Sequence, residues 1–400
     1  MANEDNANEA WFDALVRHQI GLLRVSGRVR NEILAILDAT EADIAMQIRR
    51  AGSSISLDTP AGIRRLERLL ETIRNIRSEA WTLSAQKWRE EILAVAQAEP
   101  AFLAGALRTL APAQLELLLP SVNLLTAIVN DRPFEGKVLR EWARDIRRAD
   151  LARIEQAIKI GITQGEPAAV IARRVVGTAA LKGRNGVTEI TRRQAQAITR
   201  TAINSVTNQA KREFFNLNAD IFQEELYVAT LDARTTPVCR ANDGKTFPVG
   251  KGPIPPLHFN CRSLRVAVLD GEAIGKRPSR EFTERRLLDE YNRTHGTSAR
   301  RRADLPRGHK GEFDRFSQRR RRELTGQVDA KVSYRDWLSR QSAEFQDDIL
   351  GQTRGRLFRQ GKLPLDKFVN RTGDELTLAE LAIREKAAFK AAGLDPEDFL

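Results

Sequence analysis

Apolar residues recur at helical spacing along the first 110 positions of the chain. One series runs from Phe12 to Ile44 and a second from Ile63 to Leu83, with polar residues between the apolar ones. Spacings of three and four residues are those of an amphipathic helix. Two long helices joined by a short polar segment, here 52–59, usually pair antiparallel, and neither can bury its apolar stripe alone. The pattern therefore predicts a helical hairpin whose stripes pack on each other or on a partner.

Prolines and glycines divide the region after residue 100. Four prolines, at positions 100, 112, 120 and 133, predict short helices and a domain boundary. A second apolar stripe then runs from Leu139 to Ile162, and the Gly165-Glu166-Pro167 segment ends it. We expect a short helix over 168–176 and a long helix from Thr188 to about residue 215 to follow.

Segments typical of strands appear only after this helical block. They are Glu225–Leu231, Lys245–Val249 and Ser263–Leu269, and Asn242-Asp243-Gly244 before the second is a tight-turn signal. Helical spacing returns over 334–359 and 377–392. The predicted fold class is therefore mainly α, with a small β element on a helical core. Four regions are expected: a helical N-terminal domain (1–131), a core with the β element (132–270), a basic linker region (271–330) and a helical C-terminal region (331–400).

Charge is concentrated in one stretch of the chain. The formal net charge is +12, and residues 276–322 carry 16 Lys or Arg against 7 Asp or Glu. Such blocks are usually solvated and often contact polyanions. Three interpretations stay open: contact with the phosphate backbone of double-stranded DNA, contact with an acidic protein surface, or a solvated helix face. The candidate contact residues are Arg300, Arg301, Arg302, Arg319, Arg320, Arg321 and Arg322.

The two cysteines of the chain and one of its four histidines fall close together. Cys239, His258 and Cys261 lie within 23 positions, inside the β element. Thiolate and imidazole are the ligands that zinc prefers, and a two-residue gap between His258 and Cys261 lets both side chains reach one cation. A structural zinc site needs four ligands, so Asp232, Asp243 or water would supply the fourth. The alternatives are two packed thiols beside a polar histidine, or a Cys239–Cys261 disulfide, which a reducing cytosol disfavours.

Patterns for catalysis and for membrane insertion are missing from the sequence. There is no G-x-S-x-G, H-E-x-x-H or phosphate-binding GKS/GKT motif, and His258 with Cys261 makes a geometrically poor nucleophile and base. The longest uncharged apolar stretch, 117–129, is too short to span a bilayer, and the acidic N-terminus is unlike a secretory signal. We therefore expect neither an enzyme nor a membrane protein. Arg200, in the middle of the long helix, is either a buried brace for the β element or a solvated charge.

Several separated motifs resemble one known family. They stand at 200–215 (RTAINSVTNQAKREFF), 231–247 (LDARTTPVCRANDGKTF) and 255–266 (PPLHFNCRSLRV), with further similarity at 134–146, 160–177 and 334–381. In this order they resemble the Mu F-like phage head morphogenesis family, the minor head proteins of tailed bacteriophages, over about 134–385. The family often has additional cysteines where this chain has Thr236 and Ser263, so the resemblance implies a reduced ligand set for zinc.

The resemblance implies a structural role. Such proteins associate with the phage portal protein, contact capsid or scaffold proteins, and assist head assembly and DNA packaging or delivery. The expected location is the virion, in the phage head interior or at the portal vertex, after assembly in the bacterial host cytoplasm. Two alternatives stay open: a nucleic-acid-binding protein with a small zinc element, and a toxin-type enzyme, because Mu F-like domains also occur in toxin chains.

Overall fold

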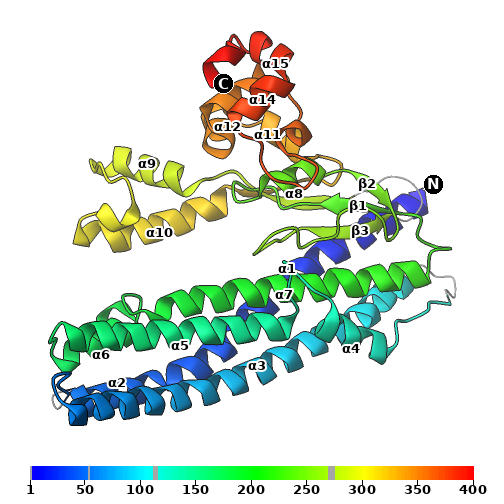
Figure 1. Ribbon diagram of the computed structural model, residues 1–400. Coiled ribbons are helices and arrows are strands. Elements are labelled where there is room, and N and C mark those ends of the chain that lie inside the picture. Colours follow the sequence, from blue (N-terminus) through cyan, green and yellow to red (C-terminus); the bar gives the residue numbers. More distant parts are fainter. Residues whose placement is uncertain (1, 53–54, 111–115, 269–274) are drawn as a thin grey trace.

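The computed structural model describes residues 2–52, 55–110, 116–268 and 275–400. About 67% of the protein is helical and its strands are few and short, which confirms the mainly α fold class. Long helices form a bundle, a small sheet lies over one end of it, and the C-terminal helices lie beyond the sheet (Figure 1). A separate pair of helices, α9 and α10, extends from the sheet alongside the bundle, and we call this pair the arm.

The bundle contains the first seven α-helices. They are α1 (Ala2–Ala39), α2 (Glu41–Gly52), α3 (Pro60–Leu110), α4 (Val122–Asp131), α5 (Leu139–Thr163), α6 (Ala168–Val176) and α7 (Thr188–Leu217), with a short 3-10 turn, η1 (Ala179–Leu181), before α7. Helix α3 begins at Pro60 as expected, because the Thr59 hydroxyl accepts the Gly62 amide at 3.1 Å. The predicted hairpin is present, since α1 and α3 share one apolar cluster.

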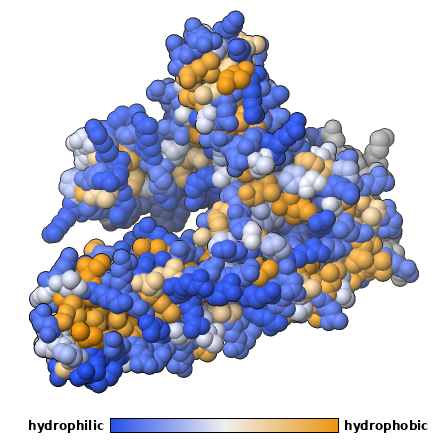
Figure 2. Space-filling model, viewed as in Figure 1, coloured by the Kyte–Doolittle hydropathy of each residue, from blue (hydrophilic) through white to orange (hydrophobic). Residues whose placement is uncertain are grey.

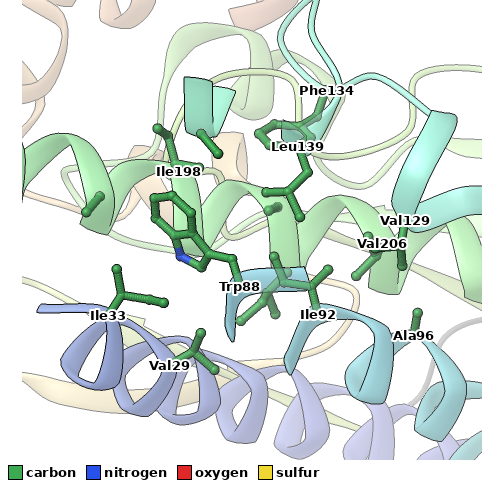
Figure 3. Close-up of a cluster of buried hydrophobic side chains, with 14 of the residues drawn as sticks. Val29, Ile33, Trp88, Ile92, Ala96, Val129, Phe134, Leu139, Ile198 and Val206 are labelled. Carbon is green, nitrogen blue, oxygen red and sulfur yellow. The ribbon is translucent and has the colours of Figure 1, made fainter. Parts of the chain in front are cut away.

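Trp88 lies at the centre of this cluster. Its ring is fully buried among side chains from α1, α3, α5 and α7, including Ile33, Leu139 and Ile198 (Figure 3). The indole nitrogen donates a hydrogen bond to the Thr199 hydroxyl at 2.8 Å, so its one polar atom is satisfied. The apolar core therefore continues across residue 131, where the sequence predicts a domain boundary.

One prediction about the prolines is wrong. Pro100 lies inside α3 and is buried, and the helix continues to Leu110. A proline in a helix interior costs about 3 kcal/mol. The stripe that includes Leu103 and Leu107 packs fully into the core, and this burial outweighs that cost. Pro120 and Pro133 do flank the short helix α4, whereas Pro112 lies outside the described residues.

The three predicted strands form one antiparallel sheet. They are β1 (Glu224–Val228), β2 (Thr246–Pro248) and β3 (Leu264–Val268), in the order β2-β1-β3. Alternate residues of β1 serve two clusters: Leu226 and Val228 pack towards the bundle, and Tyr227 packs with the cysteines. The Trp11 indole donates to the Ala267 carbonyl at 2.9 Å, which ties α1 to the sheet. The sheet is thus fixed to one end of the bundle.

The expected basic linker region contains regular structure. Strands β4 (Lys276–Arg280) and β5 (Thr325–Asp329) pair antiparallel, and between them lie α9 (Glu284–His295), η2 (Arg302–Asp304) and α10 (Arg307–Glu323). The arm has its own small core, in which Tyr291 packs against Phe313 and Phe316. This stretch is therefore a folded arm that carries the basic charge.

The C-terminal region is built from short helices. They are α11 (Tyr334–Ser339), α12 (Ala343–Leu350), α13 (Gln352–Arg359), η3 (Leu365–Phe368), α14 (Leu378–Arg384), α15 (Lys386–Ala391) and η4 (Pro396–Phe399). The helix expected over 334–359 is divided in three, because Ser342 caps α12 and Gly351, at φ 80°, separates α12 from α13. Among the described residues, no helix is long and apolar enough to cross a membrane.

Candidate metal centre

Two segments bring the two cysteines and His258 together. Cys239 lies on a short helix that the sequence pattern did not predict, α8 (Pro237–Asn242), and Cys261 lies three residues before the start of β3. His258 lies in the loop between β2 and β3. The Cys239 sulfur is 3.7 Å from the Cys261 sulfur and 3.3 Å from Nε2 of His258. All three potential ligand atoms lie within 4.8 Å of one another.

These distances fit a tetrahedral zinc ion. Two sulfurs at 2.3 Å from zinc and at the tetrahedral angle lie about 3.8 Å apart, and a sulfur and an imidazole nitrogen lie about 3.6 Å apart. The observed 3.7 and 3.3 Å are close to these values. Both cysteines are almost fully buried, whereas His258 is only partly buried. A bound ion would therefore be reached from the histidine side.

The protonation of the cluster also suits a cation. The hydrogen bond from the Cys261 thiol, together with that from His258, lowers the pKa of Cys239 to about 4 although burial raises it. The same interaction with Cys239, and burial, raise the pKa of Cys261 well above its ordinary value. Burial lowers the pKa of His258, but the Cys239 thiolate outweighs this effect and the net shift is upward. Without a metal, the Cys239 thiolate accepts hydrogen bonds from Cys261 and from His258.

Neighbouring groups hold the ligands in the required orientation. Nδ1 of His258 lies 2.8 Å from the Phe259 carbonyl, which fixes the proton on Nδ1 and leaves Nε2 free to act as a ligand. The Tyr227 hydroxyl lies 3.2 Å from the Cys239 sulfur. Burial raises the pKa of Tyr227 well above its ordinary value, so the phenol keeps its proton and donates to the thiolate. Removal of this second shell would weaken metal affinity about 10- to 100-fold.

Helix α7 supports the loop between β2 and β3 that carries His258 and Cys261, which we call the ligand loop. The Thr201 hydroxyl accepts the Asn260 amide at 2.9 Å, and the side chain of Asn204 donates to the Cys261 carbonyl at 3.2 Å. Asn260 has φ 61°, a left-handed conformation that asparagine tolerates better than most residues. The Arg200 guanidinium donates to the Asn260 side chain at 3.2 Å. Of the two interpretations of Arg200, the brace for the β element agrees with this contact.

Both aspartates considered as a fourth ligand are engaged elsewhere, so that part of the prediction is wrong. Asp232 accepts two hydrogen bonds from Arg262, at 2.5 and 2.8 Å. Asp243 is buried, and its two oxygens accept from Arg277 at 2.8 and 3.1 Å. Among the described residues, only Cys239, His258 and Cys261 form a cluster of three potential ligands. A zinc ion here would take its fourth ligand from water.

Sequence reasoning missed two groups that shape the site. Tyr227 gave no signal beyond its place in a strand. Arg265, in β3, is buried and donates to the Lys251 and Pro253 carbonyls at 3.1 and 3.0 Å, and so holds the start of the ligand loop. Its charge is balanced by buried Glu225 at 3.2 Å. An arginine inside an otherwise apolar strand, SLRVAVL, is the signal that indicates such a role.

The candidate basic residues divide into two groups. Arg319 and Arg320 do not border the cleft that the other five share, and Arg320 pairs with Glu290 at 2.9 Å. The other five border one open cleft of about 1120 Å³ between the arm and the loop after β1, and they are Arg300, Arg301, Arg302, Arg321 and Arg322. Three of these five have ion pairs within the arm, whereas Arg300 and Arg322 have none within the described ranges.

Comparison with known proteins gave one match. Residues 152–265 match the family model described as phage Mu protein F like protein. The matched segment runs from α5 through α7 to the start of β3, so it contains all three potential metal ligands and their supports on α7. The match confirms the resemblance seen in the motifs over this part of the chain. Comparisons with curated proteins and with solved structures gave no match.

Proposed function

We propose that this chain, which carries a Mu F-like segment, is a minor structural component of a phage head that associates with the portal. The family of residues 152–265 supports the general part of this proposal, a phage head morphogenesis protein. That match is the observation that carries the proposal. To this general role we add three specific parts: the portal as partner, contacts with capsid or scaffold proteins, and a role in DNA packaging or delivery.

The shape of the molecule supports a structural role. Helix α1 has 38 residues and α3 has 51, and both pack along much of their length against α7. Such a bundle is a stiff rod that can keep the sheet and the arm at a fixed distance from an attachment point. Buried ion pairs such as Arg77 with Asp150, at 2.7 Å, hold its helices in one register.

We further propose that the Cys239–His258–Cys261 cluster holds a structural zinc ion and has no catalytic role. The two sulfurs are buried and Tyr227 contacts the Cys239 sulfur, so both thiolates are held inside the fold, whereas the cluster is open on the side of His258. Zinc at this point would join α8, the ligand loop and the base of β3. The ion would thereby give this small element the stability that a larger apolar core obtains from packing.

Quantitative mass spectrometry of purified phage particles and procapsids tests the proposed function. We expect the chain at low copy relative to the major capsid protein, with chemical cross-links to the portal protein. Presence in procapsids with absence from mature particles would indicate a transient assembly factor. Absence from both would refute the structural role.

A matched pair of variants tests the zinc proposal in the same preparation. Cys261→Ala removes a ligand, and Ser84→Ala changes a fully buried residue on α3 whose hydroxyl has no hydrogen-bond partner within the described residues. If the ion stabilises the fold, particles should contain less of the Cys261→Ala chain and a normal amount of the Ser84→Ala chain.

A further inference from the structure

A second cleft lies beside the ligand loop and is lined by arginines. It has a volume of about 600 Å³ and is bordered by α1, α7, the end of β1 and the paired strands β4 and β5. On the face drawn in Figure 2 the molecule is hollowed between the arm and the bundle, and hydrophilic residues cover the arm. The cations that border this cleft are Arg24, Arg200, Arg234, Arg262, Arg277 and Arg280.

Three of these guanidinium groups lie within 4.0 Å of one carboxylate, that of Asp232. Asp232 binds Arg262 with both oxygens, while Arg280 lies 3.9 Å and Arg234 lies 4.0 Å from it. The side chain of Arg262 is 13% exposed, whereas those of Arg280 and Arg234 are 44% and 73% exposed. The two outer arginines are therefore only loosely held and can turn towards an anion in the cleft.

Arg200 adds a fourth cation with no acidic partner. The one hydrogen bond recorded for its guanidinium within the described residues goes to the neutral Asn260 side chain. Burial, and the like charges of Arg262 and Arg234, lower the pKa of Arg200 below its ordinary value. Like charges gathered in a partly buried cleft cost free energy unless an external anion offsets them. The protein keeps this cluster in spite of that cost.

The arginine cleft continues into the cleft of the arm. Arg234, Arg280 and Thr325 border both. Beyond them lie Arg300 and Arg322, both exposed and without an ion pair among the described residues. The cleft of the arm is lined by eight arginines and four carboxylates, so the joined surface carries a net positive charge over both clefts, which suits a polymer better than a small anion.

We propose that the phosphodiester backbone of a nucleic acid strand lies along these two joined clefts, with Arg234 and Arg280 at its middle. All the cations are arginines, whose planar guanidinium groups match phosphate oxygens in a two-pronged geometry. Phe259, 37% exposed in the cleft, offers a surface on which one base can stack. Binding to phosphates implies no sequence preference. The inference goes beyond the proposed head function and does not depend on it.

Fluorescence anisotropy with the purified full-length chain tests this inference. The probes are a labelled 20-nucleotide oligo-dT, a labelled 20-base-pair duplex and a labelled 20-residue polyglutamate, each measured over a range of salt. The test variant is Arg234→Gln with Arg280→Gln. The matched control is Arg64→Gln with Arg68→Gln, which removes the same charge from exposed positions on α3 far from both clefts.

Loss of two phosphate contacts should reduce affinity in proportion to counterion release. The slope of log K against log salt should become shallower by about 1.4 for the single strand or about 1.8 for the duplex, with affinity falling roughly 25- to 60-fold at 0.1 M salt. The DNA probe that shows the larger loss identifies the form that occupies the clefts. The control variant should change affinity much less.

Three results would overturn the inference. The first is no measurable binding of either DNA probe, and the second is an equal loss in the test and control variants. The third is binding of polyglutamate alone, which would assign the clefts to an acidic protein partner. Circular dichroism of each variant checks that the fold is retained. None of these results bears on incorporation into particles, so the two proposals fail separately.

Discussion

Replacement of Asp150 by alanine tests the buried network that joins the bundle helices. Asp150 on α5 accepts from Arg77 at 2.7 Å, from the Trp81 indole at 2.8 Å and from the Thr191 hydroxyl at 2.5 Å. Arg77 also donates to the Leu37 carbonyl at 2.6 Å. Four helices, α1, α3, α5 and α7, therefore meet at one carboxylate whose side chain is fully buried.

The expected cost follows from what the alanine leaves behind. The Arg77 guanidinium, 1% exposed, would lose its counter-ion and keep only neutral partners. Breaking a buried pair in this way costs about 3–5 kcal/mol. For a unit of roughly 200 residues this lowers Tm by roughly 6–20 °C. Asp145→Ala on the same helix is the control, because its pair with Lys137 is partly exposed and solvent screening leaves it little effect on stability.

Urea unfolding followed by tryptophan fluorescence and by circular dichroism provides the assay. Three of the five tryptophans, Trp11, Trp81 and Trp88, lie before residue 131, so fluorescence is weighted towards the N-terminal helices, whereas circular dichroism reports on all helices. We expect both signals to shift together in Asp150→Ala. A cost equal to that of Asp145→Ala would refute the role of the network. Separate transitions for the two signals would instead support an N-terminal folding unit that ends near residue 131, as the sequence predicts.

Two further predictions concern the metal centre and the junction with the C-terminal region. The purified chain should contain about one zinc per chain, which Cys261→Ala abolishes; zinc-free folded protein would contradict the site. Zinc binding requires Cys261 and Nε2 of His258 to lose the protons that they direct at Cys239, and the pKa of each is raised, so affinity should rise with pH, as calorimetry in two buffers can show. Asp243→Asn should leave buried Arg277 without its counter-ion and weaken the acceptor for the Tyr334 amide, so hydrogen exchange around Tyr334 should speed up about a hundredfold or more. Unchanged exchange there would show that the junction does not depend on this carboxylate.

The parts of the fold that the sequence predicts are those set by local pattern. Helices α5, α6 and α7 begin and end close to the expected residues, because each carries a continuous buried stripe. The candidate metal ligands can be picked out from the sequence because both cysteines and His258 fall in one short segment. The structure adds that their ligand atoms converge.

The parts that sequence patterns miss depend on contacts between distant positions. Strands β4 and β5 read KRPSR and TGQVD, which are polar, and their paired residues lie 45 to 53 positions apart, so no periodicity marks them. Helix α8 has only six residues, too few for a helical stripe. The choice of Asp150 as partner for Arg77 spans 73 positions and is decided by packing alone.

The metal centre and the arginine cleft share one loop, and this connects the two proposals physically. His258 and Cys261 turn towards Cys239, while Asn260 and Arg262, from the same five residues, border the cleft. Arg262 holds Asp232, the carboxylate around which the other arginines gather. If the cluster holds a zinc ion, the ion would restrict this loop and with it the position of the cleft's central ion pair, Asp232 with Arg262. His258 borders the cleft as well as the cluster, so metal coordination and the arrangement of the arginines would then depend on each other.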